Sequence, residues 1–289
     1  MQTTLESNNK GVSHFLGKNF EKAELHYKKA ISEDAQNSTA LNNLGLLYHH
    51  NKAYDKAIEY FEKALAVIEK DTYYLNLANT LTFMKLYQDA EQAYIKSLEL
   101  NPKNGNALLS LARFYTHTGK PTKATALWET LAVSSQNAGL RLELVKNYMQ
   151  IKNFEGALEL LSTLQKLKEN STVYLYIGIC EFHLKNYGIA ERAFKRTLST
   201  LPDHEKARHY LALTYLVKGD HNQAMNEFDV LLKLYPDNLN IRMDRITMLL
   251  NAKEYQVALM ELDKVLQVEP SHEKANEYKK MVDQVQKTE

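Results

Sequence analysis

The chain has 289 residues, of which 36 are lysine or arginine and 35 are aspartate or glutamate, so its formal net charge at pH 7 is +1. This balance provides no excess of positive charge for a nucleic-acid backbone, and nucleic-acid binding is therefore not expected. The single cysteine, Cys180, excludes an internal disulfide and fits a reducing compartment.

The beginning of the chain, MQTTLESNNKGVSHF, has no basic start followed by an apolar run. No signal peptide is therefore expected. No stretch approaches the roughly 20 apolar residues that a membrane span requires. These features together predict a cytoplasmic protein without a membrane span.

Residues 40–64 contain two helix-period patterns separated by a polar break at 50–52. Apolar residues recur every three or four positions in both, so each helix has one apolar stripe. Neither helix can bury its stripe alone. The two helices are therefore expected to fold as a hairpin that packs against neighbouring hairpins.

The neighbours have the same pattern, because an alanine recurs along the chain at steps of 33 or 34 residues. The alanines are Ala23, Ala57, Ala90, Ala124, Ala157, Ala190, Ala224 and Ala258. Four residues after each lies a bulky apolar side chain, namely Tyr27, Phe61, Tyr94, Trp128, Leu161, Phe194, Phe228 and Leu262. A small residue in this register predicts a close crossing of two helices, which a larger side chain would overpack.

The pattern resembles the tetratricopeptide repeat, a helix–turn–helix unit of about 34 residues. The small residue at its eighth position is matched by Gly11, Gly45, Ala78, Ala112, Gly178 and Ala212. The aromatic residue at its eleventh position is matched by Tyr48, Tyr115, Tyr148 and Tyr215. The proline near its end is matched by Pro102, Pro202, Pro236 and Pro270.

The resemblance implies an all-α fold, a superhelical solenoid of helix–turn–helix repeats that forms a single domain over 1–289. Eight repeats are expected, at 4–37, 38–70, 71–104, 105–137, 138–170, 171–204, 205–238 and 239–272. Residues 273–287 read as one further helix that caps the last repeat.

Two places depart from the pattern. Residues 133–139 lack the usual proline, which is consistent with a hinge or with ordinary sequence drift. Arg245 occupies a position that leucine normally fills, and a buried unpaired guanidinium would be very costly. We expect Arg245 to pair with a carboxylate or to extend its charged end to solvent, with partner binding as an alternative.

Little in the sequence points to catalysis. The glycines form no phosphate-binding loop, and Cys180 lies in an apolar run as a small core residue would. The ten histidines show no metal-ligand spacing. We therefore predict no enzyme activity, no cofactor and no metal.

The resemblance implies that the first helix of each repeat lines a concave groove. Its polar part contains Asn9, Asn43 and Asn76, joined by Asn79 and Asn42, whose amides can bond the backbone of an extended peptide or belong simply to the repeat consensus. Arg113 and Lys146 follow as a seat for a carboxylate. Tyr176, Ile179, Phe182, Tyr210 and Leu213 then form an apolar and aromatic patch, or in part belong to the packing between helices.

These residues predict a non-catalytic scaffold or adaptor that binds a peptide or helix of a partner protein in the groove. The alternative is a structural homo-oligomer in which a terminal helix of one copy docks in the groove of the next. Light scattering at several concentrations separates the two.

Overall fold

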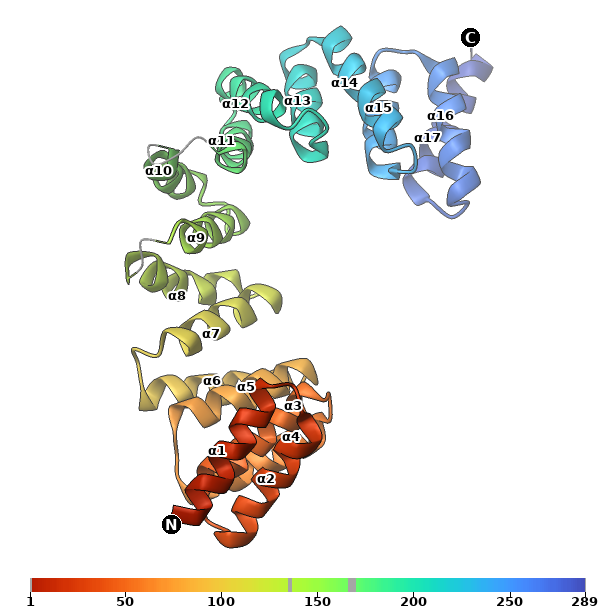
Figure 1. The fold of residues 1–289 in the computed structure, drawn as a ribbon. Helices are drawn as coiled ribbons and strands as arrows, with labels where there is room; N and C mark the ends of the chain where they lie inside the picture. The colour runs from red at the N-terminus through yellow and green to blue at the C-terminus, as the bar shows by residue number, and fades with distance from the viewer. Residues whose placement is uncertain (1, 135–136, 166–169, 289) are drawn as a thin grey trace. The chain divides into compact units, whose positions relative to one another are not determined.

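The computed structural model describes residues 2–134, 137–165 and 170–288 and contains seventeen α-helices in these ranges (Figure 1). They fall into two compact units, Met1–Ile151 and Lys152–Glu289. The all-α class is thus confirmed, while one continuous solenoid over 1–289 stays a prediction. Of the predicted hinge at 133–139, residues 135–136 lie outside the described residues.

The first unit contains nine helices in sequence. They are α1 (Gln2–Leu16), α2 (Phe20–Glu33), α3 (Ser38–His50), α4 (Tyr54–Val67), α5 (Asp71–Phe83), α6 (Tyr87–Leu100), α7 (Gly105–His117), α8 (Pro121–Ser134) and α9 (Ala138–Gln150). Each helix contacts the one before and the one after it within the unit, so the helices form consecutive hairpins.

The second unit contains eight helices with the same neighbour-to-neighbour packing. They are α10 (Phe154–Gln165), α11 (Ser171–His183), α12 (Tyr187–Thr200), α13 (Glu205–Lys218), α14 (His221–Leu234), α15 (Leu239–Asn251), α16 (Tyr255–Val268) and α17 (Glu273–Thr288).

The helix starts follow from capping side chains at a fixed repeat position. Asn37, Asn104 and Asn238 each accept a hydrogen bond from a backbone N–H in the first turn of the helix that follows. At the same position His204 accepts from the backbone N–H of Ala207 through Nδ1 at 3.2 Å. These bonds satisfy amide groups that a helix N-terminus leaves unpaired.

The recurring alanines lie where the helices cross, as predicted, and all eight have an exposed fraction of 0%. The glycine at the eighth position serves the same purpose. A Cβ added to Gly178 would lie 2.5 Å from Cε1 of Phe194, and one added to Gly45 would lie 2.7 Å from Cε1 of Phe61. The bulky residue four positions after each alanine therefore rests against the small residue of the first helix.

The turn inside each hairpin uses a left-handed residue at a fixed repeat position. Six lysines, including Lys85 (φ 61°) and Lys185 (φ 65°), and two glycines, including Gly219 (φ 84°), adopt positive φ there. This conformation suits glycine and costs lysine about 1 kcal/mol. The same backbone turn therefore recurs in both units even where its residue is unfavourable.

The predicted pairing of Arg245 is confirmed. Its side chain is 14% exposed, and its Nη2 lies 3.0 Å from Oδ1 of Asp229 and its Nη1 3.6 Å from Oε1 of Glu261. Glu261 also pairs with Arg242 and Lys264. Burial is the largest single influence and raises the pKa of Glu261, but Lys264 and Arg242 together outweigh it. The pKa of Glu261 therefore lies below its usual value.

The capping helix is confirmed as well. Ala275 and Val282 of α17 are fully buried in a cluster with Leu249, Leu262 and Val265 of α15 and α16. Its apolar side therefore covers the last repeat, while Glu273, Lys274, Glu277 and Lys280 face solvent.

Candidate functional site

The predicted asparagine row lies on the first helices α1, α3 and α5, but Asn43 and Asn76 each bond an asparagine of the preceding repeat. Nδ2 of Asn43 donates to Oδ1 of Asn8 at 3.1 Å, and Nδ2 of Asn76 donates to Oδ1 of Asn42 at 2.9 Å. Asn8, rather than the exposed Asn9, thus continues the row. Some of the amide groups that were predicted to hydrogen-bond a peptide backbone instead form hydrogen bonds between neighbouring repeats.

A hollow of about 360 Å³ lies farther along the first unit and brings Asn79 and Arg113 together. Asn79 of α5 accepts a hydrogen bond from the Tyr94 hydroxyl at 2.8 Å through Oδ1, and no described residue accepts from its Nδ2. No described carboxylate lies within 4.0 Å of the exposed Arg113 guanidinium on α7. Two donors without an acceptor among the described residues therefore face one hollow.

The walls of this hollow are apolar and aromatic. Phe83, which ends α5, is 64% exposed, while Phe114 of α7 is buried. Ser110 and His117 of α7 complete the lining together with Thr82. A carboxylate that approaches the Arg113 and Asn79 donors would thus lie beside an exposed ring.

Lys146 does not join this hollow. It lies on α9, where its Nζ donates to Oε1 of Glu143 at 2.7 Å. Asn79, and not Lys146, therefore lines this hollow together with Arg113.

The predicted aromatic patch of the second unit is largely packing between helices. The rings of Phe182 and Tyr210 meet edge to face at 5.4 Å, and Tyr210 stacks on Phe194 at 5.7 Å. Burial raises the pKa of Tyr210. Ile179 is only 2% exposed, so its prediction as a groove residue is corrected: it belongs to the interior. Tyr176 and Leu213 stay half-buried on the surface.

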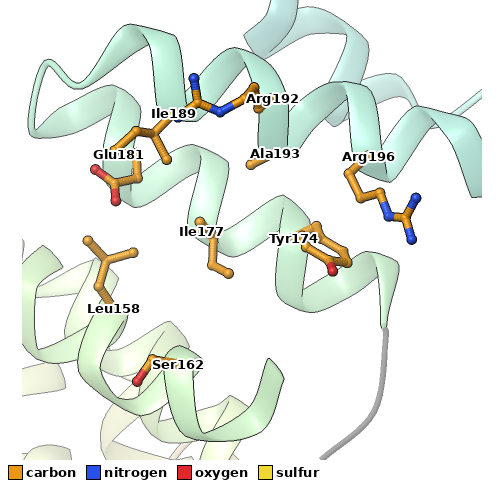
Figure 2. A pocket seen from close by; sticks show the side chains of 9 residues that line it. All are labelled: Leu158, Ser162, Tyr174, Ile177, Glu181, Ile189, Arg192, Ala193 and Arg196. Carbon is orange, nitrogen blue, oxygen red and sulfur yellow. The ribbon is translucent and has the colours of Figure 1, made fainter. Parts of the chain in front are cut away.

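A hollow that sequence reasoning did not predict lies in the second unit among α10, α11 and α12. It measures about 450 Å³ and is lined by Leu158, Ser162, Tyr174, Ile177, Glu181, Ile189, Arg192, Ala193 and Arg196. Figure 2 shows Leu158 and Ser162 of α10 across from Ile177 and Glu181 of α11, with Ile189 and both arginines on α12. The sequence signal was Glu181, which replaces the tyrosine at the eleventh repeat position.

The described residues form no candidate metal centre. Their His, Cys, Asp and Glu side chains make no cluster of three or more that could hold a metal ion. The Cys180 thiol is fully buried, and burial raises its pKa to about 12. It therefore carries the thiol form at neutral pH and acts as a core residue, as predicted.

Within residues 2–134, 137–165 and 170–288, no helix combines the length and the apolar character that crossing a bilayer requires.

Three family models match the chain. Two are described as tetratricopeptide repeat and match residues 36–103 and 93–126. The third is described as anaphase-promoting complex, cyclosome, subunit 3 and matches residues 183–265. The first tetratricopeptide match begins close to the predicted repeat boundary at 38, whereas the second begins within the predicted repeat 71–104.

Two curated relatives match at low identity. A DnaJ protein P58IPK homolog of Arabidopsis thaliana is 26% identical over 161 residues, which are 50% of this chain and 33% of that protein. The human protein O-mannosyl-transferase TMTC3 is 22% identical over 241 residues, 69% of this chain and 26% of that protein. The chain thus spans a third or less of the length of these relatives.

Among solved structures, the C-terminal part of a TPR repeat-containing protein from Cytophaga hutchinsonii has a TM-score of 0.66 at 16% identity. The match covers 80% of this chain and 96% of that one. The Cut9–Hcn1 heterotetramer of the APC/C matches with a TM-score of 0.56 at 18% identity, covering 91% of this chain and 52% of that one. These likenesses agree with the alanine register and the hairpin packing. Residues 36–126 therefore match the tetratricopeptide repeat family, and the chain has the tetratricopeptide repeat fold.

Proposed function

We propose that the chain is a non-catalytic scaffold that binds a segment of a partner protein on the surface of its first helices. The observation that carries the proposal is the hollow between α5 and α7, where Arg113 and Asn79 present donors that no described residue pairs, beside the exposed ring of Phe83. The matched APC/C structure, a hetero-tetramer, is consistent with such a role.

The hollow favours a segment with a carboxylate next to an apolar side chain. The guanidinium and the amide both donate, so they complement an acceptor-only carboxylate. The Phe83 ring supplies the contact for the neighbouring apolar group. Electrostatic attraction and burial of apolar surface would thus act on adjacent parts of one ligand.

Peptide selection on the purified chain tests the proposal. A random peptide library is selected on the wild-type protein, and the dissociation constants of the enriched peptides are measured by fluorescence anisotropy. We expect the enriched sequences to contain aspartate, glutamate or a free C-terminus. We expect Arg113→Ala to weaken their binding about tenfold, because a charge-assisted contact is lost.

The matched control is Lys103→Ala, which removes an exposed cation from the turn between α6 and α7 outside the hollow. It should change the dissociation constant less than twofold. Equal weakening by both substitutions would indicate a general attraction of charge and would contradict the proposed site.

Self-assembly through the C-terminal helix is disfavoured by packing. The apolar side of α17 is buried against α15 and α16, so docking it in another copy would first require its release. Static light scattering over a hundredfold range of concentration tests this directly, and a constant monomer mass is expected.

The absence of enzyme activity is part of the proposal. The match covers only 26% of the length of the human protein O-mannosyl-transferase TMTC3, and on this chain it falls on helical repeats. Mannosyl transfer by the purified chain alone would contradict the proposal.

A further inference from the structure

The hollow among α10, α11 and α12 occupies a place that other repeats fill with their own tyrosine. In register, Glu181 stands where Tyr48, Tyr115, Tyr148 and Tyr215 stand in other repeats. Leu158 likewise stands where the preceding repeat has Glu24, Glu91 or Glu191. The aromatic residue and its acidic partner are thus replaced by a carboxylate and a leucine.

The surroundings of the tyrosine in those repeats match the lining of the hollow. The Tyr48 hydroxyl donates to Glu24 at 2.8 Å, its ring lies 5.4 Å from the ring of Tyr60, and Lys56 Nζ lies 5.5 Å from its ring. The positions of Glu24, Tyr60 and Lys56 are those of Leu158, Ala193 and Ile189 around the hollow.

A second junction gives the same correspondence. The Tyr148 hydroxyl donates to Glu129 at 2.7 Å, and Glu129 has the register position of Ser162. The Lys123 amine lies 5.4 Å from the ring centre of Tyr115, again at the position of Ile189. The space of about 450 Å³ therefore corresponds to the place that a tyrosine ring occupies in those repeats, and this repeat has Glu181 instead of the tyrosine.

The chemistry of the lining specifies the occupant further. Ile177 and Ile189 offer apolar contact to a ring, as Leu158 does from α10. The Glu181 carboxylate accepts from Nδ2 of Asn186 through Oε2 at 2.7 Å, which leaves Oε1 to accept from a hydroxyl. Arg192 lies at the rim, and no described carboxylate is within 4.0 Å of its guanidinium.

We infer that this hollow is a second protein-docking site, which receives a tyrosine side chain flanked by an acidic residue of a partner protein. The ring takes the place of the missing tyrosine, its hydroxyl donates to Glu181, and the neighbouring carboxylate pairs with Arg192. The site lies in the second unit and involves α10 and α12, so it is separate from the hollow beside Arg113.

Two small probes test the site in the full chain. 4-Hydroxyphenylacetate carries the phenol ring and a carboxylate, whereas p-cresol carries the ring alone. Both are titrated into protein with labelled isoleucine methyl groups and followed by NMR. We expect saturable shifts at Ile177 and Ile189 with millimolar dissociation constants, as ligands of this size usually give.

Two substitutions separate the parts of the proposal. Glu181→Tyr restores the ring that other repeats place in this space, and it should abolish the shifts for both probes. Arg192→Ala should weaken 4-hydroxyphenylacetate about fivefold and leave p-cresol within twofold. Because Arg192 is exposed, this variant is expected to keep the wild-type melting temperature.

Shifts that persist in Glu181→Tyr would overturn the assignment of the ring. A loss of both probes to the same extent in Arg192→Ala would overturn the assignment of the carboxylate. The absence of any shift at Ile177 and Ile189 up to 20 mM, a limit set by the weakness of such small ligands, would overturn the site as a whole.

Discussion

Two junctions between neighbouring repeats differ in the side chains at the same two repeat positions, and only one of the two junctions is filled. At the junction of α6 with α7 and α8, the Tyr115 hydroxyl donates to Oε1 of Glu91 at 3.0 Å. Lys120 and Lys123 donate to the same carboxylate at 2.7 and 2.8 Å. At the junction of α10 with α11 and α12, Leu158 and Glu181 replace this pair and a hollow of about 450 Å³ remains.

The difference shows where a helical-repeat protein gains surface for a ligand. Both junctions have the buried alanine and the left-handed turn, so their backbones follow the same plan. Only the side chains that fill the space between repeats differ. We call a junction closed where the two side chains hydrogen-bond and fill the space, as Glu91 and Tyr115 do. We call it open where they leave a hollow, as Leu158 and Glu181 do.

The largest predicted effect comes from opening the closed junction. Tyr115 is buried, so Tyr115→Ala removes a packed ring together with the hydrogen bond to Glu91. We expect a loss of about 3 kcal/mol in the free energy of unfolding, measured by urea denaturation followed by circular dichroism. Glu181→Ala at the open junction should cost less than about 1 kcal/mol. Similar losses for both would contradict the comparison.

The charged part of the closed junction has a smaller and pH-dependent effect. Hydrogen bonds from Lys120 and then Lys123 and Tyr115 lower the pKa of Glu91 to about 2 from its usual 4.5. Because the folded-state pKa is lowered, this stabilisation is complete above about pH 4.5 and is lost as the pH falls toward 2.

We therefore expect Glu91→Gln to lower the free energy of unfolding by about 1 to 2 kcal/mol at pH 7 and by about half as much at pH 3. Urea denaturation at the two pH values measures this difference. The matched control is Glu59→Gln, whose ion pair with Lys63 is exposed on both sides and should contribute less than about 0.5 kcal/mol. A pH-independent loss at Glu91 would contradict the assignment.

The helix boundaries were predictable because each depends on local features. The predicted repeats begin at 38, 71, 105, 138, 171, 205 and 239, and α3, α5, α7, α9, α11, α13 and α15 begin at those residues. An alanine at each crossing and a capping residue at most starts act within one repeat. The capping helix, predicted at 273–287, extends over Glu273–Thr288 for the same reason.

The candidate site was less predictable because exposure depends on the neighbouring repeat. A repeat position gives the direction of a side chain from its own helix, so Asn79 and Arg113 were each expected on the surface of the first helices, but it did not predict that they line one hollow. It gives no information on the bulk of adjacent side chains, so Ile179 was expected on the surface and lies in the interior. The hollow beside Glu181 could be predicted only by comparing the eleventh position of each repeat with its partner position in the preceding repeat, here Leu158.

Closing the open junction should stabilise the protein by about 1 kcal/mol, since it exchanges a hollow for a buried ring and a hydrogen bond. The double variant Leu158→Glu with Glu181→Tyr restores the pair that Glu91 and Tyr115 form. Neither single change provides both partners, so a double-mutant cycle by urea denaturation should give a favourable coupling. Additive effects would show that the two positions do not face one another across the hollow.

The smallest predicted effect tests the premise that the two junctions share one backbone. Lys85 and Lys185 have φ values of 61° and 65° in equivalent turns of the two units. Glycine relieves the left-handed strain but also gains freedom in the unfolded chain, so Lys85→Gly and Lys185→Gly should each stabilise by about 0.5 kcal/mol. Gly219→Ala, at φ 84°, should have the opposite sign. Unequal effects at Lys85 and Lys185 would mean that the turns differ in strain, and the contrast between the junctions would then extend beyond their side chains.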